Sequence, residues 1–498
     1  MRDCAFLRLA TRRKGRITGT CDCFVAKRLL TSGLKFRTPA STNLEAAECL
    51  PERVGTLRVA NRNVVQDLQK VEHEEMTTKA PLVVIVGGGF GGLAAAKGLK
   101  RSPVDVLLID RSNHHVFQPL LYQVATSVLA PGQIASPLRS LLAEQANTSV
   151  MLGNVTGVDA ASKQVIVDAD DKVGIRISFD YLILATGATH SYFGHDEFAA
   201  FAPGLKSLSD AESLRNHLLE AFEKAEIEDD PDRRKALMTF VMVGAGPTGV
   251  EMASAIAVMI QTTFRRDFRR IDPKSAHIVL ADMAARPLGT FSEKLSEAAK
   301  QRLMSLGIDV RLGKAVQSID ADGVILGEER IQAKTVVWTA GVAPSPAGKW
   351  LGCTVDRAGR VRIQSDLTVP DHPEIFVVGD TASLDHDGRP LPGVAQVAMQ
   401  QGKYAAKSIF RKVVGHPPLP PFRYFDKGNL AVVGKGFAVL QSAGVQLSGF
   451  TAWLVWALIH IQFLSENGLR FSVFLQWVWT FLSGKRGDRL IIRQRSGS

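Results

Sequence analysis

The chain has 498 residues, 46% hydrophobic and 22% charged, so it can bury substantial cores and is not disordered throughout. Lys and Arg number 60 against 49 Asp and Glu, a net charge of +11. This excess is diffuse, without a run of five or six like charges, which argues against a dedicated nucleic-acid binder. Beyond Met76 only Cys353 remains, which excludes a disulfide framework, a Cys-based metal cluster and a dithiol redox pair there.

Residues 1–75 form a basic leading segment with 14 Lys and Arg against 9 Asp and Glu. No helix or strand period persists in it, and no apolar stretch of signal-peptide length follows the basic start. Its Arg-rich, acid-poor beginning is typical of an organelle transit peptide. A disordered extension, or a start codon placed before a true start at Met76, explains the same composition, so these alternatives stay open.

A buried parallel strand is predicted at residues 82–86, where the sequence is LVVIV. It runs into Gly87-Gly88-Gly89-Phe90-Gly91-Gly92 and then into a helical stretch. Gly87 permits the tight turn, Gly89 lets the backbone approach a pyrophosphate, and Gly92 allows close packing of helix on strand. The next strand ends at Asp110, whose carboxylate can accept hydrogen bonds from the hydroxyls of an adenosine ribose. This order of elements predicts a dinucleotide-binding fold.

The same pattern returns from residue 240 onward. A strand at 240–243 leads into Gly244-Ala245-Gly246-Pro247-Thr248-Gly249, and Glu251 lies in the first turn of the helix that follows. The next strand ends at Asp282, after an inserted segment, TTFRRDFRRIDPKSA. A carboxylate at Asp282 favours a free 2′-hydroxyl and repels a 2′-phosphate, which predicts NADH over NADPH, and Arg286 nearby can soften that preference.

Three further strands end in small or acidic residues. Tyr181–Ala185 ends in Thr186-Gly187, the stretch VVWTAG ending at Gly341 is similar, and a strand near 375 ends in Gly379-Asp380. Together with the two glycine-rich turns, they resemble the two-domain flavoprotein reductases of the glutathione-reductase superfamily. The resemblance implies an α/β protein with two Rossmann-like domains, the second inserted in the first. It also implies that the first domain holds FAD and the second the nicotinamide.

The kind of reductase is indicated by missing cysteines and by further motifs. Disulfide reductases need a Cys pair, and here the matching stretches have none. The segments FQPLLYQVAT (117–126), ATGATHSYFG (185–194) and AQVAMQQG (395–402) look like those of the type II NADH:quinone oxidoreductases, which are single-subunit, non-pumping dehydrogenases. This resemblance covers roughly residues 81–490.

The resemblance implies site residues for both cofactors. The expected cofactor-binding residues are Gly87, Gly89, Phe90, Gly92, Asp110, Thr186, Gly187, Asp380, Ala395, Gln396, Gly244, Gly246, Gly249, Glu251, Asp282 and Gly341. Asp380 matches the acid that bonds the flavin ribityl chain, while Thr186 and Gly187 mark the crossover between domains. No metal site is expected, because His114 and His115 have no third ligand spaced to join them.

Four residues are candidates for the chemistry itself. Gln396 and Gln400 share one helix face, and their neutral amides can donate to a quinone carbonyl without bringing charge into an apolar tunnel. Glu251 matches a family residue beside the nicotinamide, although an acid in a first helical turn is also favoured by the helix dipole. Lys427 matches a lysine near the flavin in bacterial members, and a surface lysine at a strand start is the alternative.

The carboxyl end is rich in tryptophan and apolar residues. Two helices are expected, the second being the twelve residues FSVFLQWVWTFL, about 18 Å long against a hydrocarbon core of ~30 Å. Lys485, Arg486 and Arg489 follow where anionic lipid would meet them. These features predict a pair of interfacial, monotopic helices. A membrane-spanning helix ending near Leu464 and a dimer interface are the open alternatives.

The predicted organisation has five parts: 1–75 a basic extension, 81–197 and 352–415 the two parts of the FAD-binding domain, 198–351 the NADH-binding domain, and 416–498 the membrane-associating region. The implied reaction is FAD-dependent oxidation of NADH with two-electron reduction of a membrane quinone such as ubiquinone, in a respiratory chain and without proton pumping. The alternatives are a reductase for a ferredoxin-like protein and a non-catalytic NADH-sensing flavoprotein.

The expected partners are NADH, a quinone, the bilayer surface and a second copy of the chain as a homodimer, without nucleic acid. The expected location is the cytoplasmic face of a bacterial inner membrane, or the mitochondrial inner membrane if residues 1–75 are a transit peptide.

Overall fold

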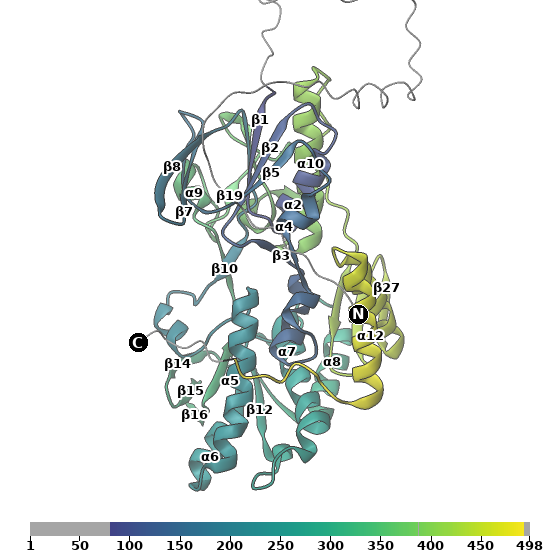
Figure 1. Ribbon diagram of the computed structural model, residues 1–498. Helices are drawn as coiled ribbons and strands as arrows, with labels where there is room; N and C mark the ends of the chain where they lie inside the picture. Colours follow the sequence, from purple (N-terminus) through teal and green to yellow (C-terminus); the bar gives the residue numbers. More distant parts are fainter. Residues whose placement is uncertain (1–79, 387, 493–498) are drawn as a thin grey trace, which may run out of the picture. The chain divides into compact units, whose positions relative to one another are not determined.

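The computed structural model describes residues 80–386 and 388–492, so the expectations for residues 1–75 lie outside the described residues (Figure 1). The first large sheet has the strand order β20-β21-β9-β1-β2-β5. Its strands are β1 (Leu82–Val86), β2 (Asp105–Asp110), β5 (Thr148–Leu152), β9 (Tyr181–Leu184), β20 (Thr368–Val369) and β21 (His372–Val377). β1 is parallel to both β2 and β9, and four of its five residues are buried, as expected for a central strand covered on both faces.

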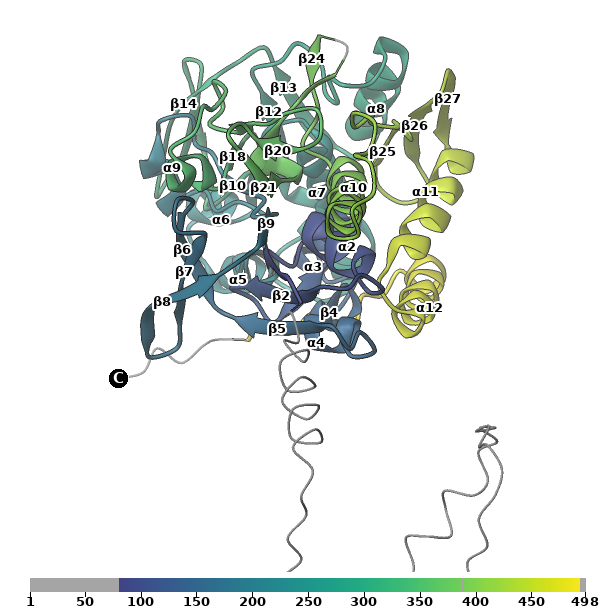
Figure 2. The same cartoon turned by 90° about the horizontal axis from the view of Figure 1, so that it is seen from above.

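Two helices cover one face of this sheet side by side, α2 (Phe90–Gly98) and α10 (Ala395–Val413) (Figure 2). They approach closely because small residues face each other: a Cβ added at Gly402 of α10 would lie 2.1 Å from the Gly91 carbonyl oxygen of α2. The hydrophobic core between them includes Ala95, Ala405 and Ala406. This packing fixes the amino end of α10 beside the glycine-rich turn that opens α2.

A second, fully parallel sheet has the order β13-β12-β11-β17. Its strands are β11 (Thr239–Val243), β12 (His277–Asp282), β13 (Ile308–Leu312) and β17 (Thr335–Trp338). The helices α5 (Leu208–Ile227), α7 (Pro247–Val258) and α8 (Glu293–Ser305) belong to this part of the chain. Every residue of β11 is buried, which matches its central position.

The chain passes twice between the two sheets. It leaves the first sheet after β9 and returns to it at β20 and β21, so the second sheet is inserted in the first domain. The two passages, β10 (Ala188–His190) and β18 (Val342–Pro344), pair with each other as antiparallel strands. The predicted fold class, two α/β nucleotide-binding domains with one inserted in the other, is thereby confirmed.

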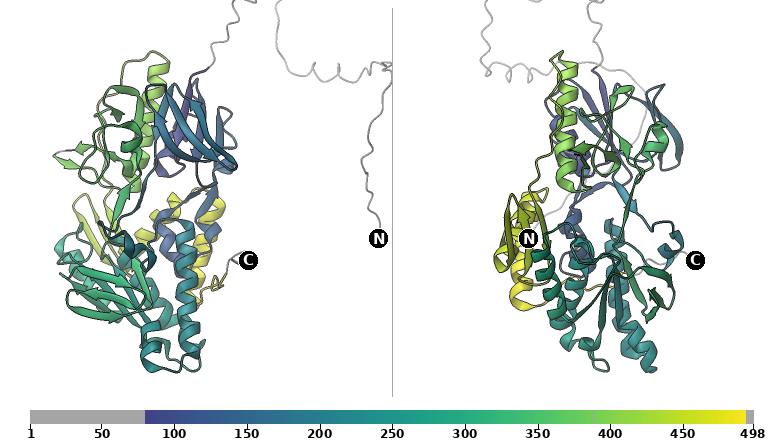
Figure 3. Two further views of the ribbon diagram at one scale, coloured as in Figure 1. Left: turned by 90° about the vertical axis from the view of Figure 1, so that its left-hand side faces the viewer. Right: turned by 180° about the vertical axis from the view of Figure 1, so that it is seen from behind.

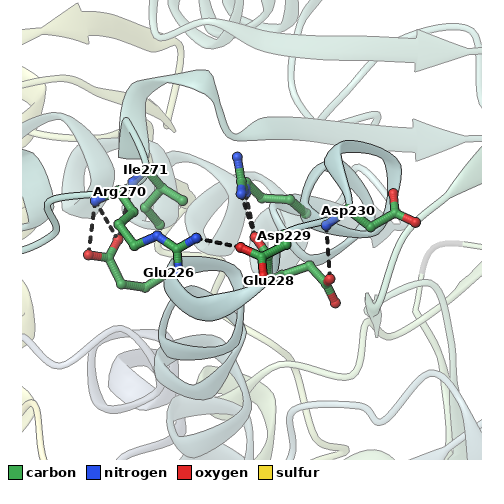
Figure 4. Close-up of polar contacts among 7 residues, drawn as sticks. Glu226, Glu228, Asp229, Asp230, Arg270 and Ile271 are labelled. Carbon is green, nitrogen blue, oxygen red and sulfur yellow. Dashed lines mark hydrogen bonds and ion pairs between the residues drawn. The ribbon is translucent and has the colours of Figure 1, made fainter.

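The segment inserted before β12 is held against the end of α5 (Figure 4). The Glu226 carboxylate accepts hydrogen bonds from three successive backbone N–H groups, those of Arg269, Arg270 and Ile271, at 2.8–3.1 Å. The Arg270 guanidinium also donates to Asp229 at 2.5 Å. These contacts hold the inserted segment against α5, and β12 pairs in parallel register with β11 directly after it.

The carboxyl-terminal part adds a three-stranded sheet and two helices. The strands are β25 (Asn429–Val432), β26 (Ala438–Ser442) and β27 (Val445–Gly449), and the helices are α11 (Phe450–Phe463) and α12 (Asn467–Ser483). α11 packs on the sheet, and α12 lies beside α11 (Figure 3). Among the described residues, no helix is both long and apolar enough to cross a membrane.

Two expectations for this region need correction. The second helix has 17 residues rather than twelve, because Asn467–Arg470 already form its first turn and Gly484, with φ of +68°, ends it. Arg486 does not face the surrounding medium: its side chain is buried and binds backbone carbonyls. Arg489 pairs with Asp267.

Candidate functional site

The first glycine-rich turn has the shape that a phosphate-binding loop requires. Gly87 has φ of +102°, and a Cβ there would lie 2.4 Å from the Ala185 carbonyl oxygen. A Cβ at Gly92 would lie 1.8 Å from the Gly87 carbonyl oxygen, so only glycine lets α2 start this close to β1. Around Gly89, by contrast, nothing lies within 4 Å of an added Cβ. That open space at a helix amino end can receive an anionic group.

Asp110 ends β2 and holds the same turn. Its Oδ2 accepts a hydrogen bond from the Gly88 N–H at 2.5 Å, and its Oδ1 accepts one from the Ser112 N–H at 2.6 Å. The Gly88 carbonyl is 2.9 Å from His115 Nδ1. Burial lowers the pKa of His115, so the ring is neutral at pH 7 and its Nδ1–H donates to that carbonyl. The turn is therefore fixed from both sides before any ligand binds.

A cavity of about 540 Å³ opens over this turn. The predicted cofactor residues that line it are Gly87, Gly89, Phe90, Asp110, Thr186, Gly187, Asp380 and Ala395. Leu121 and Thr248 also line it, so the second nucleotide fold contributes to its wall. This lining suits FAD. Asp110 can bind the ribose, the open backbone at Gly89 can receive the pyrophosphate, and Asp380 can bind the ribityl chain. The residues present therefore fit this cofactor.

Hydroxyl groups join the crossover between the domains to the cavity. Thr186 Oγ1 lies 2.5 Å from Ser345 Oγ and 3.1 Å from Thr381 Oγ1, and Thr381 Oγ1 donates to the Gly187 carbonyl at 3.0 Å. Gly379 N–H donates to the Gln401 side chain at 2.7 Å. These bonds fix the backbone on both sides of Asp380, which places that carboxylate on the cavity wall.

The second glycine-rich turn repeats the first. Gly244 has φ of +109°, and a Cβ at Gly249 would lie 1.8 Å from the Gly244 carbonyl oxygen. An added Cβ at Gly246 would again have nothing within 4 Å. Asp282 Oδ2 accepts from the Ala245 N–H at 2.5 Å. Gly341, also predicted to bind a cofactor, lies against the Phe193 ring and is not among the residues that line the 540 Å³ cavity. Its binding role stays a prediction.

Glu251 lies one turn into α7, facing β25. Its Oε1 accepts a hydrogen bond of 3.4 Å from the Val432 N–H. Burial raises the pKa of Glu251 to about 8, because the charged carboxylate loses hydration that one long hydrogen bond does not replace. A carboxyl that gains or loses its proton near neutral pH is typical of functional sites.

Gln396 and Gln400 bind the loop of residues 425–428. Gln396 donates to the Gly428 carbonyl at 3.1 Å and accepts from the Lys427 N–H at 3.3 Å. Gln400 donates to the Phe425 carbonyl at 2.9 Å and accepts from the Phe425 N–H at 3.0 Å. Each amide keeps a second N–H. The Lys427 ammonium lies 5.6 Å from the centre of the Phe463 ring, so this loop joins α10 to α11.

A chain of buried polar side chains joins α12 to α3 (Leu121–Ala125), and sequence reasoning missed it. The Trp477 indole N–H donates to Gln123 Oε1 at 2.7 Å, and Gln123 Nε2 donates to the Tyr122 hydroxyl at 3.0 Å. Arg486 lies beside these residues and is 5% exposed. Arg486 lies in the charged stretch GKRGDR (484–489) after α12, a pattern typical of surface residues, so its burial could be found only from the folded chain.

Comparisons with known proteins agree with this geometry. Residues 81–402 match the family described as pyridine nucleotide-disulphide oxidoreductase. The type II NADH:quinone oxidoreductase Ndh of Mycobacterium tuberculosis is 44% identical over 437 residues, which is 85% of this chain and 93% of that protein. A second protein of that organism, NdhA, carries the same description and is 42% identical over 83% of this chain and 89% of its own length.

Solved structures share the fold. The NDH2 of Plasmodium falciparum in complex with NADH superposes with a TM-score of 0.75 at 19% identity, covering 83% of this chain and all of that one. The sulfide:quinone oxidoreductase of Aquifex aeolicus superposes with a TM-score of 0.64 at 18% identity, covering 81% of this chain and 96% of that one.

Proposed function

The chain belongs to the type II NADH:quinone oxidoreductases of the pyridine nucleotide-disulphide oxidoreductase family, and we propose that its two nucleotide folds divide the reaction between FAD and NADH. It is an FAD-dependent NADH:quinone oxidoreductase that does not pump protons. When bound, FAD supplies a two-electron relay that side chains alone cannot provide. The observation that carries the proposal is the 540 Å³ cavity, whose wall includes both the first turn and Thr248 of the second fold.

The first fold holds FAD. Asp110 binds the adenosine ribose, the turn from Gly87 to Gly92 binds the pyrophosphate, and Asp380 binds the ribityl chain. Support comes from the two backbone hydrogen bonds that fix Asp110 and from the hydroxyl cluster that fixes the backbone beside Asp380. Residues 81–197 and 352–415 form this domain, and residues 198–351 form the NADH domain.

The second fold holds NADH. Gly244, Gly246 and Gly249 shape the loop for the pyrophosphate, and Asp282 selects the free 2′-hydroxyl. Glu251 lies three residues after Thr248, which lines the cavity, and its carboxyl accepts a hydrogen bond from Val432 of β25. We assign it to binding NADH next to the flavin.

The quinone approaches through the loop of residues 425–428. Phe425 is 70% exposed, and the loop lies between Gln396 and Gln400 of α10 and Phe463 of α11. The second N–H of each glutamine can donate to a quinone carbonyl while the first holds the loop. Lys427 closes the loop against α11.

Replacing Gln396 with alanine tests this assignment. We expect the KM for a water-soluble quinone to rise about 10-fold while the KM for NADH stays unchanged, since one hydrogen bond and the loop position are lost. Gln401, which binds Gly379 instead, is the matched control: Gln401→Ala should weaken FAD retention rather than quinone use. A rise in both KM values for Gln396→Ala would contradict the quinone role.

The helices α11 and α12 dock the protein on a membrane surface. Each turns a small set of residues inward, Ala452 and Trp456 in α11 and Val473 and Trp477 in α12. Other positions on the two helices expose large apolar side chains: Phe450, Leu454, Leu458, Ile459, Phe463, Phe471, Phe474, Leu475, Val478, Trp479 and Leu482. Many exposed apolar side chains on neighbouring helices are typical of a membrane or protein contact. We place it on the cytoplasmic face of a bacterial inner membrane, within a respiratory chain, with a homodimer contact as a second use of the same region.

Binding to vesicles tests the docking surface. Phe471→Asp combined with Leu482→Asp puts two charges on the apolar face, and we expect vesicle binding to fall at least 10-fold while oxidation of NADH by a water-soluble quinone persists. Val173→Asp, at a side chain 80% exposed on β8 (Lys172–Ser178), is the matched control and should bind as the wild type does. Unchanged binding by the double variant would refute the assignment.

A further inference from the structure

Nine described residues follow α12, Gly484–Ile492, and form the C-terminal tail. They turn back from α12 and run across α5 (Figure 1). Arg486 lies near the start of the tail, with its guanidinium between two helices. It donates through Nη1 to the carbonyl of Thr126, which directly follows α3, and through Nη2 to the carbonyl of Ala255 in α7 at 3.0 Å. One side chain thus joins α3 and α7.

The rest of α12 and the tail reinforces this connection. The Trp477 indole donates to Gln123 in α3. Gln133, in the short 3-10 turn Pro131–Gln133 that follows α3, donates to Ser472 of α12 at 2.8 Å. Further along the tail, Asp488 pairs with the buried Arg215 of α5, and Asn216 exchanges two hydrogen bonds with the backbone of Ile492. The tail is therefore anchored on both sides of Arg486.

Among residues 80–386 and 388–492, no carboxylate forms an ion pair with the buried guanidinium of Arg486. Arg486 lines a small cavity of about 110 Å³, together with residues such as Tyr122, Trp453 and Trp477, and none of the lining residues is acidic. Burial lowers the pKa of Arg486 to about 9. Burying a cation in this way opposes folding unless a specific set of acceptors receives it. Here the acceptors are the two backbone carbonyls, so the charge is stable only when α3 and α7 stand in one arrangement.

The two helices that Arg486 joins both reach the proposed flavin site. Leu121, the first residue of α3, lines the 540 Å³ cavity, and so does Thr248 in the first turn of α7. Glu251 follows Thr248 by about one turn. A shift of α3 against α7 would change the distance between the FAD cavity and the NADH fold. Hydride transfer depends steeply on such a distance.

We propose that Arg486 is a positioning residue for hydride transfer, which fixes α3 against α7 and thereby the nicotinamide fold against the flavin cavity. This inference rests on the proposed function. It assigns Arg486 a role inside the protein, in place of the contact with anionic lipid that its position after an amphipathic helix suggests.

The test compares Arg486→Ala and Arg486→Lys with Arg489→Ala in the full-length protein. Arg489 belongs to the same tail. Its guanidinium pairs with Asp267 and its Nε donates to the backbone carbonyl of Arg486 at 3.1 Å, so Arg489→Ala loosens the tail without removing the guanidinium that binds α3 and α7. In anaerobic single-turnover experiments, we expect Arg486→Ala to slow reduction of the flavin by NADH about 10-fold or more. Reoxidation by a water-soluble quinone should stay within about 2-fold. Lysine should restore part of the rate, since it keeps the charge without the fork of donors, and Arg489→Ala should match the wild type.

A second readout does not depend on turnover. Hydrogen exchange should accelerate in residues 121–129 and in α7 for Arg486→Ala, and not for Arg489→Ala. If Arg486→Ala does not fold, Arg486→Lys alone carries the test, with a smaller slowing of flavin reduction and intermediate exchange. Should the wild type fail to oxidise NADH with any quinone, the proposed function fails, while the exchange result still reports on the connection between α3 and α7.

Three results would overturn the proposal. The first is wild-type flavin reduction and wild-type exchange in Arg486→Ala. The second is an equal slowing in Arg486→Ala and Arg489→Ala, which would indicate a general loosening of the tail. The third is loss of vesicle binding by Arg486→Ala with an unchanged rate of flavin reduction, which would return Arg486 to the lipid surface.

Discussion

In the first nucleotide fold, Asp110 Oδ2 accepts a hydrogen bond from the Gly88 N–H at 2.5 Å, and in the second, Asp282 Oδ2 accepts one from the Ala245 N–H at the same distance. The other oxygens also correspond: Asp110 Oδ1 accepts from Ser112 at 2.6 Å and Asp282 Oδ1 from Ala284 at 2.7 Å. Two segments of different sequence thus build one turn, because glycine spacing and a strand-ending acid determine it.

The surroundings of the two turns differ. Over the first turn, segments from both folds enclose a cavity of about 540 Å³. After the second acid, Met283 is 76% exposed. The same turn can therefore hold a resident cofactor in one fold and an exchanging substrate in the other. What distinguishes the two is the cavity formed by segments of both folds over the first turn, and not the turn itself.

The largest expected effect comes from breaking the turns themselves. Valine at Gly92 or at Gly249 would force its Cβ to within 1.8 Å of a carbonyl oxygen, so the turn must shift. We expect Gly92→Val to yield protein without FAD. Gly249→Val should keep FAD and weaken NADH binding by about 100-fold, a cost in line with severe overpacking. Flavin absorbance and NADH titration measure the two effects.

Gly132→Ala is the control for this pair, because an added Cβ there has nothing within 4 Å. It should keep both cofactor and substrate. Loss of FAD from Gly249→Val, with NADH binding retained in Gly92→Val, would reverse the assignment of the two folds.

A smaller effect is expected when either of the two strand-ending acids is replaced by serine. Asp282→Ser removes the carboxylate that repels a 2′-phosphate, so the preference for NADH over NADPH should fall about 10-fold. Asp110→Ser should leave this preference unchanged and lower FAD retention instead. Steady-state kcat/KM for both nucleotides checks the comparison. An altered nucleotide preference in Asp110→Ser would show that the folds are assigned wrongly.

The smallest expected effect concerns Glu251, which lies two residues after the last glycine of the second turn. The equivalent position in the first turn is Ala94, which cannot ionise. The pKa of Glu251 is about 8 in the folded protein against 4.5 for an ordinary Glu. The folded chain therefore binds this proton more tightly than the unfolded chain does. The resulting stability is fully present below pH 4.5 and is lost as the pH rises to about 8.

Glutamine at position 251 cannot ionise, so it lacks this dependence on pH. The Tm advantage of Glu251→Gln over the wild type should grow between about pH 5 and pH 8 and then level off, reaching roughly 3 °C. Thermal melts across this range measure it. A constant difference would mean that Glu251 keeps its charge in the folded protein.

Local patterns were enough to predict much of the fold. Both turns and their strands follow from glycine spacing and apolar runs, which act over a few residues. The insertion of the second fold in the first was implied by the resemblance to the two-domain flavoprotein reductases that these turns and strands support. The two-domain fold that they predicted is confirmed. The length of α12 was underestimated because Asn467, Gly468 and Arg470 precede the apolar run, although they belong to the first turn of the helix.

The contacts that join distant segments could not be predicted from the sequence. Arg486 meets carbonyls 360 and 231 residues away, and the amides of Gln396 and Gln400 bind a loop 25–32 residues downstream. Periodicity places Gln396 and Gln400 on one helix face but does not identify what lies opposite. The roles assigned to Glu251, Gln396, Gln400 and Lys427 stay predictions.

An anaerobic titration tests the central claim most directly, namely that one FAD stands between the two folds and connects NADH to a quinone. NADH is added to the purified protein until the flavin absorbance no longer falls, and a water-soluble quinone is then added. We predict complete bleaching by one equivalent of NADH per FAD and full recovery of the oxidised spectrum by one equivalent of quinone. A flavin that NADH bleaches but no quinone reoxidises would contradict the account.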